Sequence, residues 1–290
     1  MALPGWSTFR FEGIGTKWEI STPGQLAPAL STELLDTVEA YDRTWSRFRA
    51  DSLVSTLSRA PGSITLPEHA AGLQELYSAL HRLSQGAVTP LIGSSLEQLG
   101  YDAEYSLSPV GMPQAPPRWE DVLEWTGTAM IATEPLVLDI GAAGKGQLVD
   151  LLGGVLLAAG HGDFLVDGSG DMLHSGSHPI TVALEHPYNP KQAIGTVELD
   201  NAALCASASN RRAWGDGLHH VLDGTTGRPI HTTVATWTMA ASALVADGLA
   251  TALFMMEPAP LEEEFDFSWL RVSSAGTATF SAGFEGRLFT

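Results

Sequence analysis

Segments of helical and strand character follow one another irregularly along the chain, and this order limits the folds open to it. Apolar residues recur at helical spacing over residues 26–45 and 67–85, and helices are also predicted over 52–57, 147–159 and 240–254. Strands are predicted over 9–20 (a pair broken at Gly13 and Gly15), 136–140, 164–166, 179–185, 194–200, 219–223, 234–239 and 268–290. Because doubly wound folds need regular strand–helix–strand units, this order favours an α+β fold. No linker or repeat divides the chain, so we expect one domain over residues 1–290.

The strongly acidic composition excludes several classes of partner. A formal net charge of −18 argues against a nucleic-acid-binding protein, since phosphate would be repelled outside any local basic pocket. A polyphosphate ligand would therefore need a metal ion or focused backbone N–H groups. The sequence contains no stretch of about 20 apolar residues, so we expect no membrane insertion. The N-terminus shows no basic region followed by an apolar one, so we expect a cytoplasmic protein, or a periplasmic or exported one if a leader has been removed.

The run Leu138-Asp-Ile-Gly-Ala-Ala-Gly-Lys-Gly146 predicts a strand, a glycine-rich turn and a helix start. In that arrangement backbone N–H groups and the helix dipole can hold a phosphate, and Lys145 adds a positive charge. It is not a P-loop, because Gly146 stands where that motif needs Ser or Thr. Taken alone, the segment is better explained by a plain tight turn with a solvated lysine. The Pro-rich residues 106–118 are typical of a surface loop.

Two further segments carry polar side chains that suit a cleft. The turn Asp167-Gly-Ser-Gly-Asp171 fits either a ligand-binding loop or an ordinary turn. On the strand predicted over 219–223, His219 and His220 would point to opposite faces, so at most one of them can reach a given cleft. A histidine there could act as a base, or it could be structural.

An aspartate inside the apolar helix predicted over 240–254 is the most informative feature. Asp247 and Thr251 are four residues apart and therefore share one face of the helix. A carboxylate is costly to bury without a partner. A carboxylate beside a hydroxyl offers the hard oxygen ligands that Mg²⁺ or Ca²⁺ prefers, although a local capping role is the alternative.

Taken in order, eight segments resemble the motifs of the ApbE family, the FAD:protein FMN transferases. They are Gly15-Thr16, Trp45-Ser-Arg-Phe-Arg-Ala-Asp-Ser52, Gly86-Ala-Val-Thr-Pro-Leu91 with Leu99-Gly-Tyr-Asp102, Leu138–Asp150, Gly168-Ser-Gly-Asp171, Ser207-Ala-Ser209, His220-Val-Leu-Asp223 with Thr226-Gly227, and Ala246-Asp247 with Ala250-Thr251. The chain departs from the family at Gly224, where relatives carry Pro, and at Ser207–Ser209, where they carry Thr-Ser-Gly.

The resemblance implies two intertwined α+β subdomains with mixed sheets and an FAD cleft between them. It implies Mg²⁺, with Ca²⁺ or Mn²⁺ as alternatives, held by Asp247, Thr251 and the backbone carbonyl of Ala142. The catalytic candidates are His220 and, second, Asp247. The residues implied in binding FAD are Thr16, Ser46, Tyr101, Asp102, Lys145, Gly146, Asp150, Asp171, Ser207, His220 and Asp223.

The implied reaction moves FMN from FAD to a Thr or Ser hydroxyl of an acceptor flavoprotein and releases AMP. Two alternatives stay open on the sequence alone. A Mg²⁺-dependent FAD pyrophosphatase would use the same site with water as acceptor, and a non-enzymatic flavin-binding protein would bind FAD without turnover.

Overall fold

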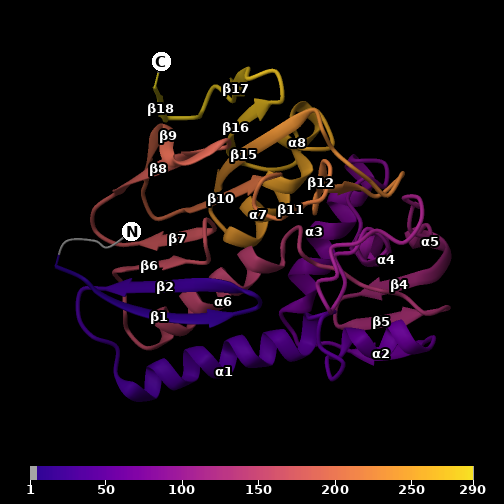
Figure 1. Cartoon of the computed structure of the whole chain (residues 1–290). Coiled ribbons are helices and arrows are strands. Elements are labelled where there is room, and N and C mark those ends of the chain that lie inside the picture. Colours follow the sequence, from indigo (N-terminus) through magenta and orange to yellow (C-terminus); the bar gives the residue numbers. More distant parts are fainter. Residues whose placement is uncertain (1–4, 290) are drawn as a thin grey trace.

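The computed structural model describes residues 5–289 and is built on one large sheet (Figure 1). Its strands lie in the order β1-β2-β6-β7-β10-β15-β16-β17. Their bounds are β1 Ser7–Gly13, β2 Thr16–Thr22, β6 Phe164–Asp167, β7 Met172–Ser175, β10 Ala203–Ala208, β15 Thr233–Ala240, β16 Ser268–Ser273 and β17 Ala278–Phe280. The predicted α+β class is confirmed, and the two ends of the predicted domain, residues 1–4 and 290, lie outside the described residues.

The sheets are antiparallel rather than mixed. Within residues 5–289 every strand pair runs antiparallel, including β2 with β6 and β7 with β10, which are distant or non-consecutive along the chain. Hairpins join several neighbours, and the longer excursions return the chain in the opposite direction. The parallel pairs that βαβ crossovers would produce therefore do not form.

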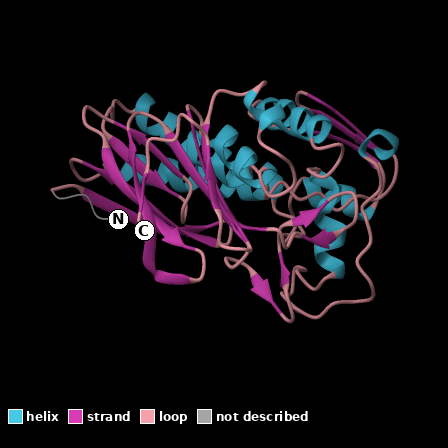
Figure 2. Ribbon diagram, turned by 90° about the horizontal axis from the view of Figure 1, so that it is seen from above, coloured by secondary structure: helices cyan, strands magenta, loops and turns pink. Residues whose placement is uncertain are grey.

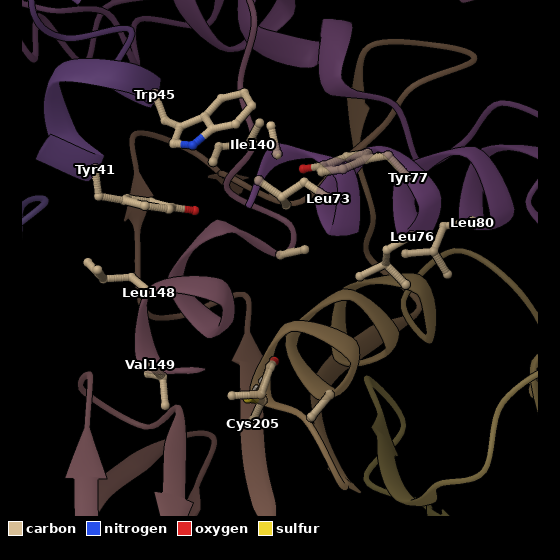
Figure 3. Packing of buried hydrophobic residues seen from close by; sticks show 14 of the residues in the cluster. Tyr41, Trp45, Leu73, Leu76, Tyr77, Leu80, Ile140, Leu148, Val149 and Cys205 are labelled. Carbon is tan, nitrogen blue, oxygen red and sulfur yellow. Dashed lines mark hydrogen bonds between the residues drawn. The ribbon is translucent and has the colours of Figure 1, made fainter. Parts of the chain in front are cut away.

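Helices cover one face of the large sheet and build the main hydrophobic core. Three of them contact its strands, α1 Pro28–Trp45, α6 Gly144–Ala158 and α7 Ala243–Ala252, and a fourth, α3 Ala70–Leu83, packs on α7; all are close to the predicted ranges. Figure 3 shows part of this core, where Tyr41 of α1, Tyr77 of α3 and Leu148 of α6 lie among other buried side chains. Two threonines of β15 fix α7 on the sheet, because Thr236 and Thr238 donate hydrogen bonds to helix carbonyls at 2.7 and 2.5 Å.

A second, three-stranded sheet covers the opposite face. It has the order β18-β9-β8, with bounds β8 Ile180–His186, β9 Asn189–Leu199 and β18 Arg287–Leu288. Side chains alternate along the large sheet: Cys205 of β10 belongs to the helical core, whereas its neighbour Leu204 packs with Leu184 and Leu199 in a second core.

The remaining elements form a smaller part of the molecule beyond the helices (Figure 2). A sheet of order β3-β5-β4 lies there, with short helices and two short strand pairs nearby. The bounds are α2 Val54–Arg59, β3 Gly62–Thr65, η1 Pro90–Ile92, α4 Gly93–Gln98, α5 Trp119–Val122, β4 Leu123–Thr126, β5 Ala129–Ala132, β11 Ala213–Trp214, β12 Leu218–His219, β13 Leu222–Asp223 and β14 Arg228–Pro229, with α8 Ala259–Glu262 nearer the large sheet.

Three local predictions need correction. Residues 136–140 form no strand: Leu136 donates to Leu57 and Asp139 to Pro90 through single backbone hydrogen bonds, so the segment is pinned between helices without a ladder. The strand predicted over 219–223 is divided into β12 and β13. Helix α6 begins at Gly144, so Lys145 lies in its first turn rather than before it. Within residues 5–289, no helix combines the length and apolar character needed to cross a membrane.

Candidate functional site

A large cleft opens where the two parts of the molecule meet. Its volume is about 870 Å³, which lies within the range of small-molecule binding pockets. The β1–β2 turn, the end of α1, the start of α6 and one side of α7 line it, together with segments 87–105 and 206–222. The lining therefore comes from segments far apart in sequence.

The charge of the cleft is opposite to that of the whole protein. Six of the 15 Lys and Arg residues line it, against three of the 33 Asp and Glu residues. The six basic residues are Lys17, Arg47, Arg49, Lys145, Arg211 and Arg212, and the three acidic ones are Asp42, Asp139 and Asp247. Four of the six, Arg47, Arg49, Lys145 and Arg211, already form ion pairs with carboxylates, so the positive charge that favours an anionic ligand comes mainly from Lys17 and Arg212.

Three oxygen-bearing groups meet in the lining where α7 approaches the start of α6. The hydroxyl of Thr251 donates a 3.1 Å hydrogen bond to the backbone carbonyl of Ala142, and it lies 3.5 Å from the hydroxyl of Ser207. Asp247, one helical turn earlier, also lines the cleft. The structure thus brings together all three residues that the sequence analysis assigned to a metal.

A buried group of charges lies around Asp247. Burial, followed by the nearby Asp171 carboxylate, raises the pKa of Asp247 well above its usual range. Lys145 forms an ion pair with Asp171. Burial by itself would lower the pKa of Lys145, but the carboxylates of Asp171 and Asp247 outweigh it and raise this pKa. Two buried carboxylates share one lysine, so a further cation beside Asp247 would relieve the excess of negative charge.

These residues fit a divalent cation by their chemistry. Carboxylate, hydroxyl and backbone carbonyl oxygens are the hard ligands that Mg²⁺ and Ca²⁺ take. Among residues 5–289 no cluster of three or more His, Cys, Asp or Glu side chains could hold a metal. A cation here would therefore depend on Thr251 and Ala142 as well as on the single carboxylate of Asp247.

Gly146 has a structural role that the sequence analysis did not give it. A Cβ atom at this position would lie 2.1 Å from the carbonyl oxygen of Ala243 and 2.7 Å from Cβ of Asp247. Its N–H donates a 2.8 Å hydrogen bond to Asp247 Oδ2. Gly146 thus allows α6 to touch α7 and orients the carboxylate, but it does not line the cleft.

Asp150, predicted to bind FAD, instead fixes the start of α7. Its carboxylate accepts hydrogen bonds from the hydroxyl of Ser242 and the N–H groups of Ala243 and Leu244, at 2.8, 2.8 and 2.9 Å. This satisfies two of the N–H groups that a helix leaves without partners at its first turn. Asp150 is outside the lining of the cleft.

Three other predicted binding residues also lie outside the lining. Asp102 accepts hydrogen bonds from the N–H and the hydroxyl of Ser106. Asp223 likewise accepts hydrogen bonds from the N–H and the hydroxyl of Thr225, so each carboxylate stabilises the turn in which it lies. Asp171 is fully buried and is held by Lys145 beneath the cleft. The sequence pattern could not separate such turn and core carboxylates from ligand contacts, because both favour Asp beside Gly or Ser.

The remaining predicted residues do line the cleft: Thr16, Ser46, Tyr101, Lys145, Ser207 and His220. The adjacent histidines separate, since His219 lines a different, smaller pocket, although His220 follows β12 and is not part of a strand as predicted. Burial, assisted by the charge of Arg212, lowers the pKa of His220 to about 3, so its imidazole is neutral at pH 7. Its Nδ1 is buried and has no hydrogen-bond partner within residues 5–289.

Sequence reasoning missed an arginine–aspartate pair and an aromatic wall. Arg47 Nε donates a 2.6 Å hydrogen bond to Asp139, and its guanidinium lies 4.1 Å from the ring centre of Phe48. Tyr105 stacks on Phe48, with ring centres 5.3 Å apart and planes 12° from parallel. Arg212 donates to the hydroxyl of Tyr101. Arg47 and Phe48 lie in a quoted motif, but no local pattern indicated that Asp139 or Arg212 would join them.

Comparison with known proteins identifies the family. The ApbE family model matches residues 14–265. An FAD:protein FMN transferase of Salmonella typhimurium is 24% identical over an alignment that covers 99% of this chain and 87% of that protein. An FAD:protein FMN transferase of Rhodobacter capsulatus is 27% identical over an alignment that covers 84% of this chain and 50% of that protein. The crystal structure of the ApbE protein of Thermotoga maritima superposes with a TM-score of 0.81 at 21% identity, covering 96% and 97% of the two chains. Since the family model covers most of the sequence and the fold agrees throughout, this chain belongs to the ApbE family.

Proposed function

We propose that the protein transfers FMN from FAD to a Thr or Ser hydroxyl of an acceptor flavoprotein, releasing AMP. The observation that carries this proposal is the group of Asp247, Thr251 and the Ala142 carbonyl inside a basic cleft. The relatives of Salmonella and Rhodobacter are FAD:protein FMN transferases. Lining residues run from Ile14 to Met255, which supports one catalytic domain rather than two independent ones.

The cleft offers both kinds of contact that a dinucleotide needs. Lys17 and Arg212 supply positive charge for the pyrophosphate, and Arg211 adds to it although it also pairs with Glu185. Tyr105 is exposed and is backed by Phe48, and its ring presents an aromatic surface on which a planar heterocycle can stack. FAD is thereby bound by charge at its centre and by stacking at an end.

A divalent cation held by Asp247, Thr251 and Ala142, most simply Mg²⁺ with Ca²⁺ or Mn²⁺ as substitutes, would neutralise pyrophosphate charge that increases during the reaction. The raised pKa of Asp247 supports this assignment, because its ionised form needs a nearby cation in so buried a place. Gly146 and Asp150 serve the same end indirectly, since they fix the carboxylate and the helix that carries it.

The transfer of FMN is a nucleophilic displacement at phosphorus. The acceptor oxygen forms a bond to the phosphorus of the FMN half, and the bond from that phosphorus to the bridging oxygen breaks. The bridging oxygen leaves as part of AMP, and the hydroxyl proton passes to a base. His220 is the first candidate for that base, because its imidazole is neutral and lines the cleft. A bound pyrophosphate would raise its pKa towards the working range.

The test incubates the protein with FAD, Mg²⁺ and candidate acceptors that carry an exposed Thr or Ser. Covalent flavin on the acceptor is read by in-gel fluorescence, AMP by chromatography and FAD affinity by fluorescence titration. The variant Asp247→Asn should lose transfer, whereas Asp36→Asn, at an exposed aspartate of α1 that does not line the cleft, should not.

Each alternative reading has its own signature in this assay. AMP release without any flavinylated acceptor would show a pyrophosphatase instead of a transferase. Tight FAD binding with neither product would show a flavin-binding protein without turnover.

A further inference from the structure

An exposed apolar segment borders the cleft and has no cover within the described residues. In residues 105–112, here called the rim loop, Tyr105, Leu107, Val110 and Met112 are 50, 44, 74 and 71% exposed. These are four of the ten large hydrophobic side chains that are exposed in residues 5–289. Single exposed apolar residues are ordinary, but a cluster of this density indicates an interaction surface.

The backbone around the rim loop is held in place, so this exposure is not the result of a loose chain. The N–H of Leu107 donates to Gly100 at 2.8 Å, and the N–H of Val110 donates to Gln98 at 2.7 Å. At the far end, the carbonyl of Gln114 accepts from Ser95 at 2.8 Å. The structure therefore presents these side chains to solvent at a fixed position.

The rim loop is continuous with the cleft. Tyr105 is one of its four exposed apolar residues, and it also lines the cleft and stacks on Phe48. Any protein that delivers a hydroxyl into the cleft must lie across its opening and so reach this loop. No charged residue occurs within residues 105–112, so this part of the rim presents no charge of its own to a partner.

We propose that the rim loop is the docking surface for the acceptor protein, and that it takes an apolar segment next to the Thr or Ser that receives FMN. This rests on the proposed transferase function. An uncharged, fixed, apolar surface selects a partner by buried apolar area. Selectivity among acceptors would then depend on residues that flank the hydroxyl rather than on FAD contacts.

The experiment compares the double variant V110Q/M112Q with wild type and with L157Q. Neither Val110 nor Met112 lines the cleft, so FAD binding is left intact. Leu157, on α6, is 55% exposed and serves as the matched apolar control away from the rim loop. The probes are two short synthetic peptides with one Thr each, flanked either by Leu and Val or by Gln and Ser.

For the apolar peptide, V110Q/M112Q should raise KM about tenfold, with kcat, FAD affinity and the oligomeric state unchanged. L157Q should match wild type, and wild type should prefer the apolar peptide. An unchanged KM in V110Q/M112Q, or equal use of both peptides, overturns the docking assignment while leaving the transferase function in place. Light scattering that shows a wild-type dimer dissociated by V110Q/M112Q assigns the surface to a second copy and also overturns it. FMN on neither peptide with wild type overturns the docking assignment, whereas the transferase function is overturned only if the acceptor proteins also stay unlabelled.

Discussion

Replacing Gly146 by alanine should separate two helices at the proposed metal site. The new Cβ would lie 2.1 Å from the carbonyl oxygen of Ala243 and 2.7 Å from Cβ of Asp247, whereas ordinary contacts begin at 3.4 Å. Both neighbours belong to the backbone region of α7 and not to the end of a flexible side chain. Helices α6 and α7 must therefore move apart by roughly 1 Å, the scale at which core overpacking is felt.

The magnitude follows from three contributions. Overpacking of this kind costs about 1–3 kcal/mol. Weakening the buried 2.8 Å hydrogen bond from Gly146 to Asp247 adds about 1.5–3 kcal/mol, since the acceptor is a carboxylate. Alanine returns about 1 kcal/mol through its better helix propensity. We expect the free energy of unfolding to fall by about 3 kcal/mol, and Mg²⁺ affinity to fall with it because Asp247 is displaced.

The same helix provides the control. Gly154, two turns further along α6, is exposed, and a Cβ there would meet no atom within 4 Å. Gly154→Ala should therefore gain up to about 1 kcal/mol from helix propensity alone. Urea unfolding measures both variants, and calorimetric titration measures Mg²⁺ binding. If Gly146→Ala unfolds at the same urea concentration as Gly154→Ala, a Cβ atom at position 146 does not clash with α7, and the prediction is wrong.

Three further predictions concern other residues of the site. Asp150→Ala should lower the free energy of unfolding by about 2 kcal/mol in urea, because it leaves two N–H groups at the start of α7 without an acceptor; unchanged stability would contradict that capping role. Mg²⁺ should raise the melting temperature more at pH 8 than at pH 5, and equal shifts would count against the metal assignment. The direction of this difference follows from the raised pKa of Asp247. Without a metal, the protein loses stability as the pH rises through that pKa, because the buried carboxyl group must ionise. Above that pKa the carboxylate is ionised, and this is the form that binds a cation. His220→Gln should slow transfer by about 100-fold with FAD affinity unchanged, and a rate near wild type would exclude it as the base. The pKa of His220 is about 3 in the folded protein, against 6.5 for an ordinary histidine. The native protein therefore loses stability as the pH falls from 6.5 towards 3. His220→Gln should remove this part of the acid sensitivity, which is at most about 5 kcal/mol.

Local spacing was enough to predict the main helices and the face of α7 that Asp247 and Thr251 share. The apolar periodicities of residues 26–45, 67–85 and 240–254 correspond to α1, α3 and α7. Asp247 and Thr251 share a face because the helical repeat fixes the relative direction of side chains four residues apart. His219 and His220 do lie in different pockets, but His220 stands after the end of β12, so strand alternation does not explain their separation.

Long-range packing decided the rest. Asp139 meets Arg47 across 92 positions of sequence, and Asp150 reaches the start of α7 across more than 90. Residues 136–140 have the composition of a strand, but helices on both sides leave no strand to pair with.

The sequence by itself therefore determined the α+β class, the main helices and the oxygen pair on one face of α7. The tertiary structure alone decided which aspartates face the cleft and which close a turn, cap a helix or stay buried under it. The physical reason is that the helical repeat fixes directions within one element, whereas the partner that each direction meets depends on how distant elements pack.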